Sequence, residues 1–246
     1  MLKSERMKKK ILEGIESVVF DLDDTLISTR KVFREAITES SKFLLKSPMC
    51  SKGKRKVDEV AEMMLEIIKA IREEFFVRPA IMEMATLLTA QLLGLDKKDK
   101  CVEKGLERIR RIYNRDVPEI FEGAGETVDV FNGIGIRTFL MTHGQEDYTW
   151  RKIIGAGLIG KFEKIVCFSV DRKKEDQWEN EFDKLGLKTE NILVIGDNPK
   201  ADIEATIRLG ARAVWVSSGL ERERSKVEEL WKKRVIEIEK IGDLFK

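Results

Sequence analysis

The chain has 246 residues, of which 42% are apolar and 37% charged, and its formal net charge is +2. This length can hold one large or two small domains with an ample core, and the composition is that of a globular protein with a charged surface. A charge so near balance argues against a nucleic acid or a membrane surface as the main partner. No segment approaches the roughly 18 consecutive apolar residues that a membrane span needs.

The cysteines indicate a reducing compartment. Cys50, Cys101 and Cys167 are odd in number, widely spaced and without a Cys-x-x-Cys pair, which argues against a disulfide framework or a zinc site. The basic stretch 1–10 is not followed by an apolar segment of signal-peptide length. We therefore expect a cytoplasmic protein.

The first elements are a short amphipathic helix at 3–15 and a strand at 17–22, which is followed by a cluster of oxygen-bearing side chains. Three carboxylates crowded together repel one another unless a cation or a proton is present, so this cluster is suited to a hard cation, with Mg²⁺ preferred. The alternative is a solvated turn in which two of the acids cap the next helix. The cluster comprises Asp21, Asp23, Asp24 and Thr25.

Residues 29–116 have a helical pattern throughout. Apolar residues recur there with a period near 3.6, and no strand-like run occurs among them. Breaks at Ser47-Pro48, Arg78-Pro79 and Gly94 divide the segment into four predicted helices. We expect an all-helical domain inserted after the first strand.

After Pro118 short apolar runs alternate with helical patterns. Strands that are continuously apolar are typical of a parallel sheet covered on both faces. We therefore predict a doubly wound, Rossmann-like α/β core formed by 1–28 and 117–246, with the helical insertion at 29–116. The predicted strands are 136–141, 165–168, 192–195 and 213–216, the helices are 145–156, 175–185 and 199–209, and the tail adds a helix after 221 and an edge strand near 235–238.

Chemically useful residues follow four of these strands. In open α/β sheets ligands bind beyond the carboxyl ends of the strands, so these residues should meet at one edge. Each residue alone is compatible with an ordinary surface or strand-end position, but their combination is not expected of a sheet without a site. After the acids of the first strand they are Thr142, His143 and Gly144, then Ser169, Asp171, Lys173 and Lys174, then Gly196, Asp197, Asn198 and Asp202.

In this order the residues resemble the haloacid dehalogenase superfamily, in its phosphatase branch with a helical cap of the C1 type. The first motif is matched by Asp21-Leu22-Asp23-Asp24-Thr25 and the second by Thr142 in Thr142-His143-Gly144. The fourth is matched by Gly196-Asp197 with Asp202 further on. The third is a lysine, for which Lys173 is favoured over the adjacent Lys174 by its spacing from Trp178 and Leu185.

The resemblance implies an enzyme, a Mg²⁺-dependent phosphoric monoester hydrolase acting on a small phosphorylated metabolite. Asp21 would be the nucleophile that forms an aspartyl-phosphate, and Asp23 would act as general acid and then as general base. Lys173 would offset charge between Asp21 and the phosphoryl group, to which Thr142 would bind. The implied Mg²⁺ ligands are the Asp21 and Asp197 carboxylates and the Asp23 backbone carbonyl, with Asp202 close by or bound through water.

Several alternatives remain at this point. His143 is assigned to the phosphate-binding edge of the site as a loop residue, not as a general base. Asp24 is interpreted as a rim or capping residue. A phosphomutase of the same superfamily, a receiver-type phospho-acceptor domain and a member that binds without turnover are alternative functions. The presence of Asp23 argues against a dehalogenase, and the sequence leaves the oligomeric state open.

Overall fold

The computed structural model describes residues 12–50, 55–74, 79–168, 175–218, 231 and 233–245. The chain divides into two compact units. One unit combines the segment up to Ser28 with the segment from Glu119 onward, and the other is Thr29–Pro118. Most of the predicted helix at 3–15 and of the predicted tail helix lies outside the described residues.

The second unit contains the four helices that the apolar period predicts. An aspartate begins the last of them, because the Asp99 carboxylate accepts a hydrogen bond of 2.7 Å from the Cys101 backbone N–H. Proline begins the third, where its missing N–H costs no hydrogen bond. The helices are α2 (Thr29–Leu45), α3 (Val57–Glu74), α4 (Pro79–Leu92) and α5 (Lys100–Asn114).

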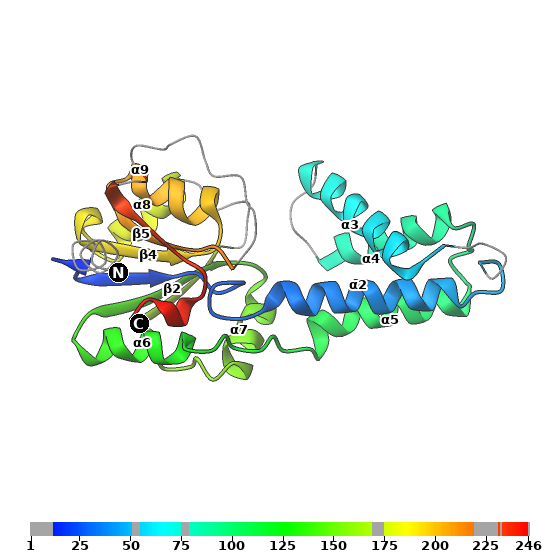
Figure 1. Ribbon diagram of the computed structural model, residues 1–246, viewed down its shortest axis with the longest axis horizontal. Coiled ribbons are helices and arrows are strands. Elements are labelled where there is room, and N and C mark those ends of the chain that lie inside the picture. The colour runs from blue at the N-terminus through cyan, green and yellow to red at the C-terminus, as the bar shows by residue number, and fades with distance from the viewer. Residues whose placement is uncertain are drawn as a thin grey trace. The chain divides into compact units, whose positions relative to one another are not determined.

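Helices α2 and α5 lie side by side along their length (Figure 1). The Phe33 and Tyr113 rings meet edge to face with centroids 5.9 Å apart. Close approach also requires a glycine, since a Cβ atom at Gly105 would lie 2.9 Å from the Ser40 hydroxyl oxygen. These contacts make the pair a continuous packed interface within the helical unit.

The first unit is built on a six-stranded sheet in which every neighbouring pair is parallel, in the order β3-β2-β1-β4-β5-β6. Its strands are short and mostly buried, in agreement with the continuous apolar runs in the sequence. The doubly wound α/β prediction is confirmed, including the edge strand β6. The strands are β1 (Ser17–Phe20), β2 (Arg137–His143), β3 (Lys164–Phe168), β4 (Ile192–Gly196), β5 (Arg212–Val216) and β6 (Val235–Ile238).

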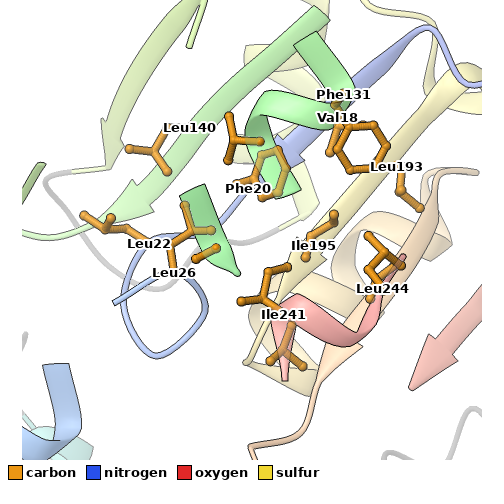
Figure 2. Close-up of a cluster of buried hydrophobic side chains, with 14 of the residues drawn as sticks. Val18, Phe20, Leu22, Leu26, Phe131, Leu140, Leu193, Ile195, Ile241 and Leu244 are labelled. Carbon is orange, nitrogen blue, oxygen red and sulfur yellow. The ribbon is translucent and has the colours of Figure 1, made fainter. Parts of the chain in front are cut away.

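Both faces of the sheet are covered. Successive side chains of β1 point to opposite faces, and each set packs into a different buried cluster. Val18 and Phe20 belong to one buried cluster, in which Phe131 of α6 (Ala124–Gly133) and Ile241 of η3 (Ile241–Asp243) also lie (Figure 2). Val19 belongs to the cluster on the other face, which is covered by α8 (Glu175–Lys184). The helices and turns that connect or follow the strands thus bury both faces of β1.

The connections differ from the prediction in two places. Helix α6 is not predicted, because its ten residues include Gly125 and Gly133, which weaken the helical pattern. The predicted helix at 199–209 begins instead as a π-helical turn, η2 (Pro199–Glu204), and only then continues as α9 (Ala205–Arg208). The other helix of the core, α7 (Glu146–Gly155), and the 3₁₀ turn η1 (Thr189–Asn191) precede β3 and β4 respectively.

Strand order reverses at β1. The chain passes from β1 to β2 and β3 on one side, then crosses to β4, β5 and β6 on the other. Phe20, the last residue of β1, is in register with Leu140 of β2 and Ile195 of β4. Residues just beyond these three positions are therefore brought to the switch point, where α/β sheets bind their ligands.

Candidate active site

Three buried carboxylates converge at this switch point. Each of Asp21, Asp197 and Asp202 offers an oxygen that lies within 4.8 Å of those of the other two. Their side chains come from the ends of β1 and β4 and from η2, and the three residues are 5%, 8% and 1% exposed. Such a group is electrostatically unfavourable unless a proton or a cation compensates its charge.

Asp21 is positioned by the sheet itself. Its backbone N–H donates a hydrogen bond of 2.8 Å to the carbonyl oxygen of Ile195, which extends the β1–β4 ladder past the end of the strand. The hydroxyl of Thr25 lies 3.3 Å from Asp21 Oδ2 and can donate to it. The Asp21 carboxylate is thus held on a rigid strand end, which fixes its position and direction.

The turn after β1 is tight and returns on itself. Asp24 has a φ of 61°, in the left-handed region that aspartate tolerates better than most residues. Its backbone N–H donates to the carbonyl oxygen of Ile27 at 2.8 Å. Because α2 begins only at Thr29, neither Asp23 nor Asp24 occupies the position directly before that helix.

Asp202 approaches the backbone of β4 very closely. A Cβ atom at Gly196 would lie 2.5 Å from Asp202 Cβ and 2.6 Å from its Oδ2, so only glycine fits there. The Asn198 backbone N–H donates to Asp202 Oδ2 at 3.0 Å. The side-chain oxygen of Asn198 also accepts from the backbone N–H groups of Lys200 and Ala201, both at 3.1 Å. Asn198 therefore caps the π-helical turn that carries Asp202.

Two buried tryptophans fix the backbone around these acids. The Trp215 indole N–H donates to the carbonyl oxygen of Asp197 at 3.1 Å, and the Trp178 indole N–H donates to that of Ala201 at 2.8 Å. Rare π-helical geometry is frequent at functional sites, where neighbouring contacts maintain it. The sequence places Asn198 among the strand-end residues, and an Asn-Pro dipeptide after a strand is a helix-start signal, but it does not predict the backbone contacts of the two tryptophans.

Thr142 is the next-to-last residue of β2 and is 1% exposed. Among the described residues its hydroxyl oxygen has no hydrogen-bond partner, although most buried hydroxyls have one. His143 follows at the strand end and is half-buried. A buried hydroxyl without a protein partner is suited to a ligand that supplies the missing hydrogen bond.

Asp23 is not one of the three clustered carboxylates, and its side chain pairs with a lysine. Lys152 Nζ lies 2.5 Å from Asp23 Oδ1 and 2.6 Å from Oδ2. The Lys152 side chain is 3% exposed and comes from the buried face of α7, beside Tyr148 and Ile153. Lys152 is not among the residues predicted for the site; its only signal in the sequence is a lysine at a core-facing position of the predicted helix at 145–156.

The predicted site residues that follow β3 lie outside the described part of the chain. Lys173 and the alternative Lys174 lie in the segment 169–174, outside the described residues, as do Ser169 and Asp171. Cys167 on β3 donates its thiol to the carbonyl oxygen of Gly144 at 3.1 Å. Burial raises the pKa of the Cys167 thiol, so it is a neutral group and not a thiolate nucleophile.

The donor set of the site fits a hard divalent cation. Carboxylate oxygens are the ligands that Mg²⁺ prefers, and the three buried carboxylates are close enough to share one ion. Their burial at a spacing that would otherwise be repulsive is the observation that favours this fit.

Comparison with known proteins agrees with this architecture. A family model described as haloacid dehalogenase-like hydrolase matches residues 15–210. The chain is 25% identical over 214 residues to glyceraldehyde 3-phosphate phosphatase of Pyrococcus furiosus, covering 85% of this chain and 83% of that protein. It is 29% identical over 92 residues to phosphoserine phosphatase of Thermus thermophilus, covering 36% and 37% of the two chains.

Solved structures give the same fold. A haloacid dehalogenase-like family hydrolase from Xanthomonas campestris superposes with a TM-score of 0.73 at 18% identity, covering 94% of this chain and 89% of that one. The family model confirms the resemblance to the haloacid dehalogenase superfamily that the sequence motifs indicate. The chain belongs to the haloacid dehalogenase-like hydrolases, and it is an enzyme of that class.

Proposed function

We propose that the protein is a Mg²⁺-dependent phosphatase that hydrolyses a small phosphorylated metabolite through an aspartyl-phosphate on Asp21. The observation that carries the proposal is the convergence of three buried carboxylates at the switch point, from Asp21, Asp197 and Asp202. The curated relatives are phosphatases, which supports the same reaction class.

In the first half-reaction an Asp21 carboxylate oxygen attacks the phosphorus atom of the substrate. The bond between phosphorus and the alcohol oxygen breaks, and Asp23 donates a proton to that leaving oxygen. The products are the free alcohol and an acyl phosphate on Asp21. Asp21 can attack without losing its geometry because the hydrogen bond from its backbone N–H to Ile195 fixes it to the sheet.

In the second half-reaction water attacks the phosphorus atom of the acyl phosphate. Asp23, now a carboxylate, takes the proton from that water, and the bond between phosphorus and the Asp21 oxygen breaks. Inorganic phosphate and the original carboxylate result. The same acid/base group thus serves both halves of the double displacement.

The other residues of the proposed site bind the phosphoryl group or the metal ion and form no covalent bond with the substrate. When bound, Mg²⁺ would neutralise phosphoryl oxygens, and the Asp21 and Asp197 carboxylates, the Asp23 carbonyl and Asp202 would hold it. We assign the buried Thr142 hydroxyl and the Lys173 ammonium to the phosphoryl oxygens, and His143 to the edge of the same subsite.

The helices between 29 and 116 are proposed to form the cap that selects the substrate. The two curated relatives are named for three-carbon phosphomonoesters, glyceraldehyde 3-phosphate and phosphoserine. We therefore place small phosphomonoesters first in a substrate panel, and a reducing cytoplasm as the setting. The structure describes no helix that is both long and apolar enough to cross a membrane.

The proposal is tested by phosphate release from p-nitrophenyl phosphate and a panel of small phosphomonoesters. We expect turnover with Mg²⁺, its loss with EDTA and its return on adding Mg²⁺. Asp21→Asn should lower kcat by at least about 10³-fold, because the amide is not a nucleophile. Asp129→Asn is the matched control, since Asp129 is an exposed aspartate of the same unit that pairs with Lys161.

Equal turnover by Asp21→Asn and wild type would contradict the assignment of the nucleophile. Wild-type protein that releases no phosphate from any member of the panel, with any divalent metal, would contradict the phosphatase. Transfer of the phosphoryl group back onto a sugar phosphate without net phosphate release would indicate the mutase reaction instead.

A further inference from the structure

The Asp23–Lys152 pair is a largely buried ion pair of the first unit. Lys152 reaches Asp23 from helix α7 and places its Nζ 2.5 and 2.6 Å from the two carboxylate oxygens. The Lys152 side chain is 3% exposed and that of Asp23 is 26% exposed. The Lys152 ammonium also lies 4.8 Å from the centre of the Tyr148 ring.

Such a pair is not explained by stability alone. Desolvating an ammonium costs several kcal/mol, and the Coulomb attraction in a buried pair often does no more than offset this cost. An apolar residue would suit the position better as core packing, since the neighbouring Ile153 on the same helix face is fully buried. We therefore look for the role of Lys152 in its contact with Asp23.

The effect of this contact is geometric. Two hydrogen bonds from one ammonium to both oxygens of one carboxylate define the direction of the side chain and the plane of the carboxylate. Asp23 follows the end of β1 in a tight turn, where its own backbone contacts include a bridge to Ile27. Loss of these two hydrogen bonds should therefore widen the range of rotamers that the half-buried Asp23 side chain samples.

We propose that Lys152 is the positioning residue of Asp23, orienting its carboxyl group for proton donation to the leaving oxygen and for proton uptake from the attacking water. This inference rests on the proposed function, because it assumes that Asp23 is the acid/base group. It assigns to α7 a role in the reaction that none of the sequence motifs includes.

If Lys152 positions Asp23, replacing Lys152 should lower kcat/KM by an amount that depends on the leaving group of the substrate. The ratio kcat/KM reports the steps up to formation of the acyl phosphate, in which Asp23 protonates the departing alcohol. An alkoxide needs this proton, whereas p-nitrophenolate is stable enough to leave without it. A misplaced Asp23 should therefore impair an alkyl phosphate such as glycerol 2-phosphate much more than p-nitrophenyl phosphate.

The test compares wild type, Lys152→Met, Asp23→Asn and the double variant on these two substrates. We expect Lys152→Met to lower kcat/KM for glycerol 2-phosphate about 10-fold more than for p-nitrophenyl phosphate. In the Asp23→Asn background the same substitution should change kcat/KM by less than about twofold, because residues that act as a unit are not additive.

Lys161→Met is the matched control. Lys161 forms the same kind of pair, with its Nζ 2.6 and 2.7 Å from the two carboxylate oxygens of Asp129, but on a surface of the same unit away from the converging acids. Its loss should leave the ratio of the two substrates unchanged. Circular dichroism and thermal melting establish that each variant is folded, and Lys152→Gln replaces Lys152→Met if the latter does not fold.

The inference is overturned if Lys152→Met lowers kcat/KM equally for both substrates, or if its loss persists in full when Asp23 is already asparagine. Failure of both Lys152 variants to fold would assign the lysine to core stability and would also overturn it. A wild type without turnover, or Asp23→Asn with undiminished turnover, would instead contradict the proposed function on which the inference rests.

Discussion

At the scale of single residues, we expect the Thr142 hydroxyl to be required for catalysis but not for the stability of the fold. Its hydroxyl is buried without a hydrogen-bond partner among the described residues, so its replacement breaks no bond within them. We expect Thr142→Val to leave the free energy of unfolding unchanged or slightly raised, and to lower kcat/KM by roughly 10²-fold, as for loss of one phosphoryl-binding donor. Urea unfolding and steady-state kinetics measure the two effects.

Thr138 on the same strand provides the opposite case. Its buried hydroxyl lies 2.7 Å from Asn132 Oδ1 and 2.9 Å from the carbonyl oxygen of Lys161. Thr138→Val should therefore cost about 1 kcal/mol or more of stability and leave kcat/KM nearly unchanged. If the two variants behaved alike, the assignment of Thr142 to the phosphoryl group would be wrong.

Gly196 is required by the carboxylate that it faces. Because a Cβ atom there would lie 2.5 Å from Asp202 Cβ, Gly196→Ala must displace Asp202 or the strand. We expect a loss of about 1–3 kcal/mol in stability and a weaker apparent affinity for Mg²⁺ in the phosphatase assay. A Mg²⁺ titration of activity is the decisive measurement.

Gly133 provides the control for the glycine-to-alanine substitution at Gly196. A Cβ atom at Gly133, the last residue of α6, would meet nothing within 4 Å. Gly133→Ala should be neutral or stabilising by a few tenths of a kcal/mol, with an unchanged Mg²⁺ requirement. An unaltered Mg²⁺ titration in Gly196→Ala would show that Asp202 does not contribute to metal binding.

At the scale of elements, the helical unit contains a group that should make it sensitive to alkali. Burial of Tyr113 near the end of α5, where its ring meets Phe33 of α2, raises its pKa from 10.0 to about 12. Its phenol is therefore neutral in the folded chain over a range in which the unfolded chain is already ionised. The stability that results is complete below pH 10 and is lost as the pH rises from about 10 to about 12.

Tyr113→Phe removes this dependence. The variant and wild type should differ in unfolding free energy by a constant amount below pH 9. The variant should then gain on wild type by at most about 2 kcal/mol as the pH approaches 12. Urea unfolding followed by circular dichroism at pH 8 and pH 11 measures the change. A constant difference between the two proteins across this range would show that Tyr113 is accessible to solvent.

The elements also show where sequence patterns suffice. Long apolar periodicity predicts α2 through α5, and continuous apolar runs predict every strand of the sheet. The pattern fails for α6, because glycines interrupt a short helix that is held by burial of Val128 and Phe131 against β1. It also fails for η2, where the π-helical turn depends on the distant Trp178 contact with Ala201. Tertiary contacts decide both cases, and local periodicity does not contain them.

The site shows the same division. Motif spacing and strand ends identify Asp21, Asp197 and Asp202 as neighbours, because parallel strands deliver their carboxyl ends to one edge. The partner of Asp23 is not visible in this way. Lys152 is distant in sequence and reaches Asp23 only because α7 packs against the sheet beside β1. The chemistry at the strand ends is thus predictable from sequence, and the contact from a neighbouring helix is not.

At the scale of the whole molecule, the topology explains why an insertion does not disturb the site. The chain leaves the first unit after Ser28 and returns to it at Glu119. The Ser28 backbone N–H donates a hydrogen bond of 2.8 Å to the Glu119 carbonyl oxygen. An isolated bridge between Ile27 and Ile120 closes the same junction. The first unit is therefore continuous across the junction, and the contacts described for the three acids all come from that unit.

The central claim is the covalent intermediate on Asp21. It is tested most directly by rapid acid quench of a reaction with p-nitrophenyl [³²P]phosphate, followed by peptide mapping. We predict hydroxylamine-sensitive label on the peptide that contains Asp21, none in Asp21→Asn and an accumulation in Asp23→Asn, in which water is no longer activated. Label on another residue, or phosphate release at full rate without any labelled protein at the earliest quench times, would contradict the account.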